Sequence, residues 1–334
     1  MEFFVRLFRM VPTIALGMIM GLSSPAIAED VTPTQILFTN VNVFDGFSSE
    51  LQEGMDVLVE GNFIKEVDKN IEAPGAIVVD VEGRTMTPGL IDMHQHVMLN
   101  PPEGTAAYQT RWDDAAGGAF AQHHLMNNML LKGITTVRDI AGDPLDIAKA
   151  IDMGQLPGPR IYSSGGAISQ TGGHGDWAGR NVPEDILHNH LEMSQRTQNT
   201  WVVDGPDEVT KAVRMNLRRG AAFIKVMGGG GVASEFDPLE SMGLAKDEVA
   251  RAVEIAADNG TYVATHAYHD ASYNRLLDLG VRSFEHGFLV SEPTVKRMAS
   301  MGQDVVWSFQ CFMSVNTFGD YDAMPGFFSH EQKV

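Results

Sequence analysis

Residues 87–96, Thr-Pro-Gly-Leu-Ile-Asp-Met-His-Gln-His, are the stretch of sequence that decides the fold. The largely apolar run after Pro88 is typical of a β-strand in a protein core, and it ends at His94 and His96. Because successive side chains of a strand alternate between its two faces, residues two apart point to the same face. The spacing therefore predicts two neighbouring imidazoles. Alone, such a pair fits either a metal site or two core histidines.

The chain on both sides of this stretch predicts parallel βα units. Short strands alternate with longer helical patterns, of which residues 207–219 and 246–259 are the clearest, each followed by a glycine. We predict an α/β fold over residues 86–334, a TIM-type (β/α)8 barrel. Because closure needs eight strands, we expect the barrel to be truncated after the seventh. The seven predicted strands are residues 90–94, 135–139, 160–164, 223–227, 262–266, 282–286 and 305–309.

Residues 29–85 are predicted to form the N-terminal part of a small β-sandwich domain. Asp45-Gly46 and Gly61-Asn62 are turn sequences, and the second pair predicts a hairpin. We expect an antiparallel sheet whose apolar face needs a partner, because so small a unit is rarely stable alone. The strands are expected at residues 36–43, 56–60, 63–67 and 77–81.

Residues 1–28 have the order of a secretory signal peptide. Arg6 and Arg9 precede an apolar run over residues 11–22, and Ala26-Ile27-Ala28 is a small-residue cleavage site. The run is short for a membrane span, so we expect no span after signal removal and a periplasmic or secreted protein. The alternative is a buried N-terminal helix.

Composition excludes several classes of protein. With 334 residues, 44% of them hydrophobic, the chain can bury a substantial core and is not expected to be disordered. Its formal net charge of −19 would repel phosphate backbones and argues against binding of nucleic acid. The single cysteine, Cys311, cannot form an internal disulfide and is expected to be a small core residue.

Three further residues strengthen the metal hypothesis. Lys225 is a cation inside the apolar strand at 223–227, where an unpaired charge would be costly. His266 and His286 end the next two predicted strands. In a TIM barrel the carboxyl ends of the strands form the mouth of the active site, so these three residues should converge there with His94 and His96.

At these residues the chain resembles the amidohydrolase superfamily, and within it the imidazolonepropionase-like group that includes Xaa-Pro dipeptidases and related metallocarboxypeptidases. The resemblance runs from residue 36 to the end and is most specific at residues 87–96, 133–139, 169–176 and 284–287. It implies a carbamate on Lys225 that bridges two divalent metals, usually zinc. His94 and His96 would hold one metal, and His266 and His286 the other. A metal-bound hydroxide would then attack the substrate carbonyl.

The resemblance also implies two substrate contacts. Tyr268 matches a tyrosine that hydrogen-bonds the developing oxyanion, although a residue of the pocket wall is an equal alternative. His174, in the glycine-rich stretch 169–176, would meet a terminal carboxylate of the substrate; the alternative is a surface loop. The other histidines are expected on the surface or in helix packing: His123, His124, His188, His190, His269 and His330.

The family's eighth strand carries an aspartate that completes the first metal site and shuttles the proton, and we expect this chain to end before it. The leading hypothesis for the parent protein is hydrolysis of an amide bond in a dipeptide or N-acyl amino acid. One alternative is hydrolysis of a cyclic amide, lactone or phosphoester on the same site. Another is a truncated, non-catalytic fragment that binds metal or partner chains. A homo-oligomer is an open possibility.

Overall fold

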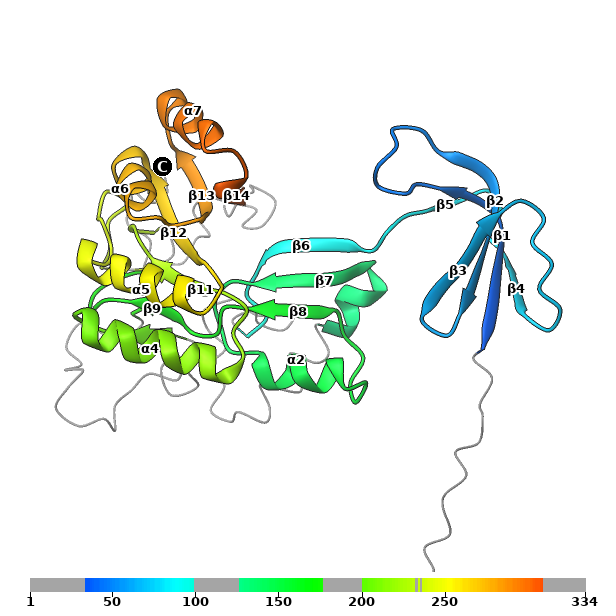
Figure 1. The fold of residues 1–334 in the computed structure, drawn as a ribbon, viewed down its shortest axis with the longest axis horizontal. Helices are drawn as coiled ribbons and strands as arrows, with labels where there is room; N and C mark the ends of the chain where they lie inside the picture. Colours follow the sequence, from blue (N-terminus) through cyan, green and yellow to red (C-terminus); the bar gives the residue numbers. More distant parts are fainter. Residues whose placement is uncertain (1–33, 99–125, 177–199, 232–233, 235, 309–334) are drawn as a thin grey trace, which may run out of the picture. The chain divides into compact units, whose positions relative to one another are not determined.

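The computed structural model describes residues 34–98, 126–176, 200–231, 234 and 236–308, and the chain divides into two compact units between Pro88 and Gly89 (Figure 1). Several predicted features lie outside the described residues: the signal segment 1–28, Cys311, and the histidines His123, His124, His188, His190 and His330.

Unit 1, up to Pro88, contains a five-stranded sheet in its described part, with the order β3-β2-β1-β4 and with β5 also paired to β1. The predicted hairpin is present, because β2 and β3 pair antiparallel around Gly61, which has a φ of 61°. The strands are β1 (Gln35–Val43), β2 (Gln52–Glu60), β3 (Phe63–Asp68), β4 (Ile77–Asp80) and β5 (Thr85–Met86).

The prediction of a purely antiparallel sheet is wrong. Strands β4 and β5 both run parallel to β1. The reason is the connection after β3, which carries the chain across to the far side of β1 instead of forming another hairpin. Val41 and Val57 are buried in this unit, whereas Phe63 and Val78 are 71% and 61% exposed. A second sheet that would make a sandwich stays a prediction.

Unit 2, from Gly89, has parallel strands that fit part of a barrel. Within the described residues they form a three-stranded sheet, β6-β7-β8, and a six-stranded sheet, β10-β9-β11-β12-β13-β14. Each of the seven strands predicted here is present. The strands are β6 (Leu90–Gln95), β7 (Ile134–Asp139), β8 (Arg160–Ser163), β9 (Ala167–Ser169), β10 (Thr200–Val202), β11 (Ile224–Met227), β12 (Val263–His269), β13 (Ser283–Leu289) and β14 (Val306–Ser308).

The segment after β8 joins the two sheets. β8 pairs with β7, but after three residues that include Gly165, at a φ of 67°, the chain resumes as β9 and pairs with β11. The amide of Ala222 donates to the carbonyl of Ser163 across the joint, at 2.8 Å. Strands β9 and β10 were not predicted, because three-residue strands are too short to show a period.

Helices follow the strands as the βα pattern predicted. They are α2 (Leu145–Asp152), α4 (Pro206–Arg219), α5 (Lys246–Asp258), α6 (Asp270–Asp278) and α7 (Glu292–Ser300), with a 3₁₀ turn at Gly302–Asp304. α4 begins with Pro206 in its first turn and ends at Gly220, whose φ of 100° stops the helix. No helix in the described part of the chain is long and apolar enough to cross a membrane.

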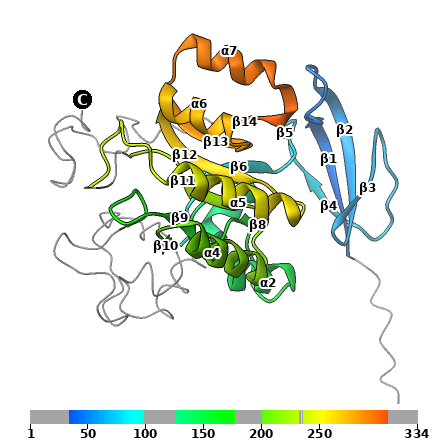
Figure 2. The same cartoon turned by 60° about the vertical axis from the view of Figure 1, so that its left-hand side comes forward.

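The core of unit 2 lies between the strands and these helices. Figures 1 and 2 show α4 and α5 side by side along β9 and β11. The main cluster of buried side chains includes Ile224 and Phe284 from strands and Val249 and Leu276 from helices, all 0% exposed. This packing holds β11, β12 and β13, the strands that carry Lys225, His266 and His286, in fixed register.

Candidate metal centre

His94 and His96 lie together at the end of β6, with their Nε2 atoms 3.3 Å apart. The Nδ1 atom of His94 lies 2.9 Å from a carboxylate oxygen of Glu285, and Nδ1 of His96 lies 3.2 Å from the carbonyl oxygen of Ala141. Both partners only accept hydrogen bonds when Glu285 is ionised, so each Nδ1 must carry the proton. Each Nε2 of the neutral rings then presents a lone pair to the other.

Two facing lone pairs repel each other unless a cation lies between them. Two nitrogen ligands of a tetrahedral zinc ion, at 2.0–2.1 Å each, are about 3.3 Å apart. The separation between His94 and His96 matches this value. The pair therefore fits two ligands of one metal ion.

His266 and His286 adjoin this pair. The ring centroids of His94 and His286 are 4.8 Å apart, and those of His266 and His286 are 4.5 Å apart. His266 is buried and its Nε2 lies 3.1 Å from the carbonyl oxygen of Gly230. Nδ1 of His286 is buried and has no hydrogen-bond partner among the described residues. A buried nitrogen without a partner is costly, and a ligand at that atom would satisfy it.

The prediction that His266 and His286 end their strands is wrong in detail, because each strand continues for three more residues. At His286 the backbone is irregular: His286 and Gly287 have φ values of 67° and 73°, and the pairing with β12 shifts register here. A Cβ atom at Gly287 would lie 2.3 Å from the hydroxyl oxygen of Tyr273. A bulge of this kind redirects a side chain within a sheet.

Charge and burial keep these imidazoles neutral. Burial, and next the charge of Lys225, lower the pKa of His96 to about 4. Burial is likewise the largest cause that lowers the pKa of His94, His266 and His286 well below the usual value, and the charge of Lys225 contributes to each shift. The structure thus brings all five predicted ligands together, and the four histidines have lone pairs available at neutral pH.

Lys225 itself is 1% exposed on β11. Burial lowers its pKa to about 8, although the carboxylate of Glu285 opposes the shift. Within the described residues no three His, Cys, Asp or Glu side chains are arranged to hold a metal ion.

The two predicted substrate residues border the histidines. The ring of His174 stacks on His266 at 3.8 Å, and its Nδ1 lies 2.7 Å from Oγ of Ser234 and 3.1 Å from Oδ2 of Asp237. Tyr268 is buried on β12 and stacks on His286 at 5.1 Å. His269, expected on the surface or in packing, caps α6 by accepting from the amide of Ser272.

Sequence reasoning missed three buried charged residues. Glu285 is 0% exposed, Arg138 is 5% exposed, and Asp139 is 0% exposed. Asp139 accepts from the amide of Val97, at 2.7 Å, and so fixes the chain just after His96; burial raises its pKa to about 7. All three are ionisable residues within predicted strands, as Lys225 is.

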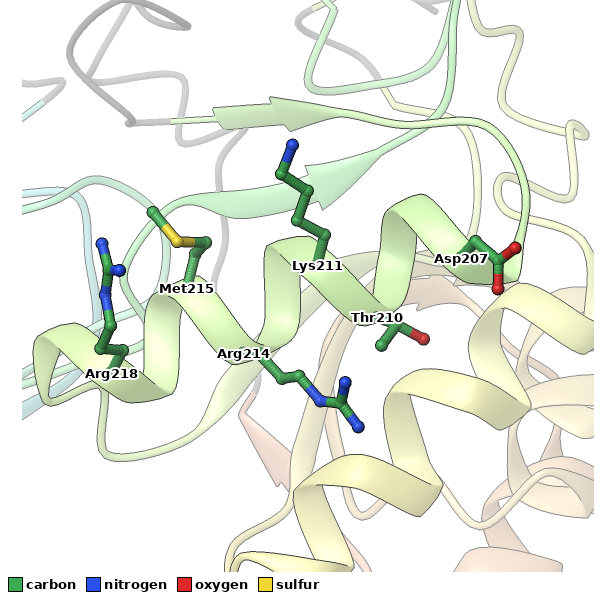
Figure 3. Close-up of a pocket in the computed structure, with 6 residues that line it drawn as sticks. All are labelled: Asp207, Thr210, Lys211, Arg214, Met215 and Arg218. Atoms are coloured by element: carbon green, nitrogen blue, oxygen red, sulfur yellow. The ribbon is translucent and has the colours of Figure 1, made fainter.

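A shallow pocket on the surface of unit 2 contains none of these residues. All its lining residues lie on α4, as Figure 3 shows, and half of them carry long cationic side chains. We assign it no chemistry. It is lined by Asp207, Thr210, Lys211, Arg214, Met215 and Arg218.

Comparison with known proteins identifies the family. Residues 85–308, more than half of the chain, match the amidohydrolase family. The chain belongs to the amidohydrolase family. The resemblance to the amidohydrolase superfamily is confirmed, and the parallel strands of unit 2 fit part of the predicted barrel.

Individual amidohydrolases resemble this chain over different shares of its length. Ochratoxinase from Aspergillus niger is 37% identical over 179 residues, which are 52% of this chain and 37% of ochratoxinase. The chain thus spans well under half of that curated relative. A solved prolidase complexed with N-methylphosphonate-L-proline has 34% identity and a TM-score of 0.76, covering 90% of this chain and 71% of the prolidase. A Xaa-Pro dipeptidase with bound methionine has 26% identity and a TM-score of 0.74, covering 90% and 72%.

Proposed function

We propose that this amidohydrolase cleaves the amide bond of a dipeptide or an N-acyl amino acid with the help of two divalent metal ions, zinc being the expected metal. The observation that carries the proposal is the pair of Nε2 lone pairs that face each other between His94 and His96. The similar proteins named prolidase and Xaa-Pro dipeptidase support the choice of substrate.

The ligands are proposed to divide between the two ions. His94 and His96 would hold one, while His266 and His286 would hold the other. When bound, the metals would acidify a water molecule and polarise the carbonyl of the scissile amide. The protein's part is to keep the four imidazoles neutral, which their burial does.

Lys225 is proposed to supply the shared oxygen ligand as a carbamate. Only a neutral amine attacks carbon dioxide, and an ordinary lysine is almost fully protonated at neutral pH. The lowered pKa of Lys225, about 8, leaves a usable fraction of free amine near physiological pH. Carboxylation also replaces a costly buried cation by an anion among metal ions.

Tyr268 and His174 are proposed to bind the substrate. The ring of Tyr268 stacks on His286, so its phenol would be beside the second metal, where a hydroxyl donor stabilises a developing oxyanion. His174 stacks on His266 and would orient the substrate's carboxylate. We further propose export through residues 1–28, with cleavage after Ala28, which N-terminal sequencing of the secreted protein would test.

The test is metal analysis combined with turnover. The full-length parent protein is purified, incubated with zinc and bicarbonate, and assayed for bound zinc and for hydrolysis of dipeptides, N-acyl amino acids and cyclic amides. We expect bound zinc and release of amino acid from the first two substrate classes. Lys225→Met should abolish both, whereas the exposed Lys211→Met should change neither. Absence of both zinc and turnover in the unaltered full-length protein would refute the proposal.

A further inference from the structure

Glu285 lies at the centre of a buried polar network that the proposed reaction does not use directly. One of its carboxylate oxygens, Oε2, lies 2.9 Å from Nδ1 of His94. The other, Oε1, accepts from Nη1 of Arg138 and from Oγ of Ser283, each at 2.9 Å. Arg138 also donates to Oγ of Ser283 at 2.8 Å. The network therefore links β6, β7 and β13.

The two carboxylate oxygens have different tasks. Arg138 can only donate hydrogen bonds, and Ser283 donates when its hydroxyl hydrogen points to Oε1. Oε1 therefore accepts from both residues. Oε2 is left to accept the hydrogen on Nδ1 of His94. The position of Arg138 is fixed from another side, since its guanidinium lies over the ring of Phe223 at 4.6 Å.

Contacts of its backbone also fix the position of Glu285. The carbonyl oxygen of Glu285 accepts from the hydroxyl of Tyr273 at 3.0 Å. In the sheet, Glu285 pairs with His266 on β12 and with Ser308 on β14. Glu285 is 0% exposed, so water does not compete for its hydrogen bonds.

We propose that Glu285 is a positioning residue that keeps the proton of His94 on Nδ1 and thereby directs the lone pair of Nε2 toward the metal. The inference rests on the proposed function, because it assumes that His94 binds a metal ion. The tautomer of His94 can nevertheless be measured in the metal-free chain. Metal-bound histidines commonly donate their other ring nitrogen to such a carboxylate, and loss of that partner weakens metal binding.

Glu285→Gln tests this inference because the two sides of the carboxylate differ. An amide has one acceptor oxygen, and the donors Arg138 and Ser283 require that oxygen at the Oε1 position. The NH₂ group of the glutamine then faces His94 and donates to Nδ1. His94 must move its proton to Nε2, the wrong tautomer for a metal ligand. The substitution is nearly isosteric, so packing changes little.

Two measurements are made. Histidine-selective ¹⁵N labelling of the metal-free chain reports the tautomer, and the signals of His94 are identified by their absence in His94→Gln. Competition with a chromophoric chelator reports the zinc affinity. We expect Nδ1–H in the unaltered chain, Nε2–H in Glu285→Gln, and about 10- to 100-fold weaker zinc binding in the variant. Glu254→Gln, the same change on the exposed side of α5, should alter neither.

The outcomes separate the two proposals. A purely structural role for Glu285 would leave the tautomer of His94 and the zinc affinity of Glu285→Gln unchanged, and that result overturns the inference. An Nε2–H signal in the unaltered chain overturns it as well, even if the variant does not fold. If the unaltered chain binds no zinc, the proposed function fails, while the nitrogen spectra still decide whether Glu285 sets the tautomer.

Discussion

Replacing Lys225 by methionine should stabilise the metal-free chain while removing its proposed activity. Burial lowers the pKa of Lys225 from 10.5 to about 8. One pKa unit corresponds to about 1.36 kcal/mol, so holding the ammonium in the folded chain costs about 3 kcal/mol at pH 7. Methionine has a similar length and carries no charge, so we expect Lys225→Met to raise the free energy of unfolding by up to about 3 kcal/mol.

The sign of the pH dependence follows from the same shift. The folded state binds the proton of Lys225 less tightly than the unfolded state does, so the free energy of unfolding rises with pH between about 8 and 10.5. Lys225→Met lacks this contribution. The variant and the unaltered chain should therefore have similar free energies of unfolding near pH 10.5.

Urea unfolding in carbonate-free buffer with a chelator, at pH 7 and pH 10.5, measures both effects. Lys211→Met, at an exposed position on α4, is the matched control and should leave the stability almost unchanged. Zinc and bicarbonate should then stabilise the unaltered chain but not Lys225→Met. The reasoning is refuted if Lys225→Met is no more stable than the unaltered chain at pH 7, or if the two proteins keep the same pH slope.

Two stability predictions concern the scaffold, and urea unfolding checks both. Phe284→Ala removes a fully buried ring and should cost about 3–5 kcal/mol, whereas Phe63→Ala, at a residue 71% exposed, should cost below about 1 kcal/mol; equal losses would contradict the assigned core. Gly243 and Gly302 both have a φ of 61°, but a Cβ at Gly243 would lie 2.3 Å from a backbone oxygen and at Gly302 would meet nothing within 4 Å. Gly302→Ala should cost about 1 kcal/mol and Gly243→Ala about 3 kcal/mol, and the reverse order would be inconsistent with this geometry.

The strands of unit 2 were predictable because local pattern and burial agree there. The run that ends at His94, for example, is apolar, short and bounded by Pro88, and the structure has a strand there. The sheet of unit 1 was only half predictable. The Gly61 hairpin is local, but the parallel pairing of β4 with β1 depends on where an eight-residue connection carries the chain, which no local pattern encodes.

The candidate site was predictable as a list of ligands but not as a network. His94, His96, Lys225, His266 and His286 were identified because each is a nitrogen-bearing residue in or after an apolar strand. Arg138 and Glu285 also lie within predicted strands, but neither has the position or spacing that indicated a metal ligand. Their importance shows only when β7 and β13 approach across the interior, because the partner of each charge is far away in sequence. His94 and His96, by contrast, were predictable as neighbours because they lie two residues apart on one strand.

The positive φ values at His286 and Gly287 make the position of a proposed metal ligand depend on the helix α6. Tyr273 on α6 fills the space that any larger residue at 287 would need, and its hydroxyl is bonded to the backbone of Glu285. A substitution on α6 can therefore shift the histidines although the substituted residue does not itself contact the substrate. Tolerance to mutation should thus be low at Tyr273 and Gly287, as well as at the histidines themselves.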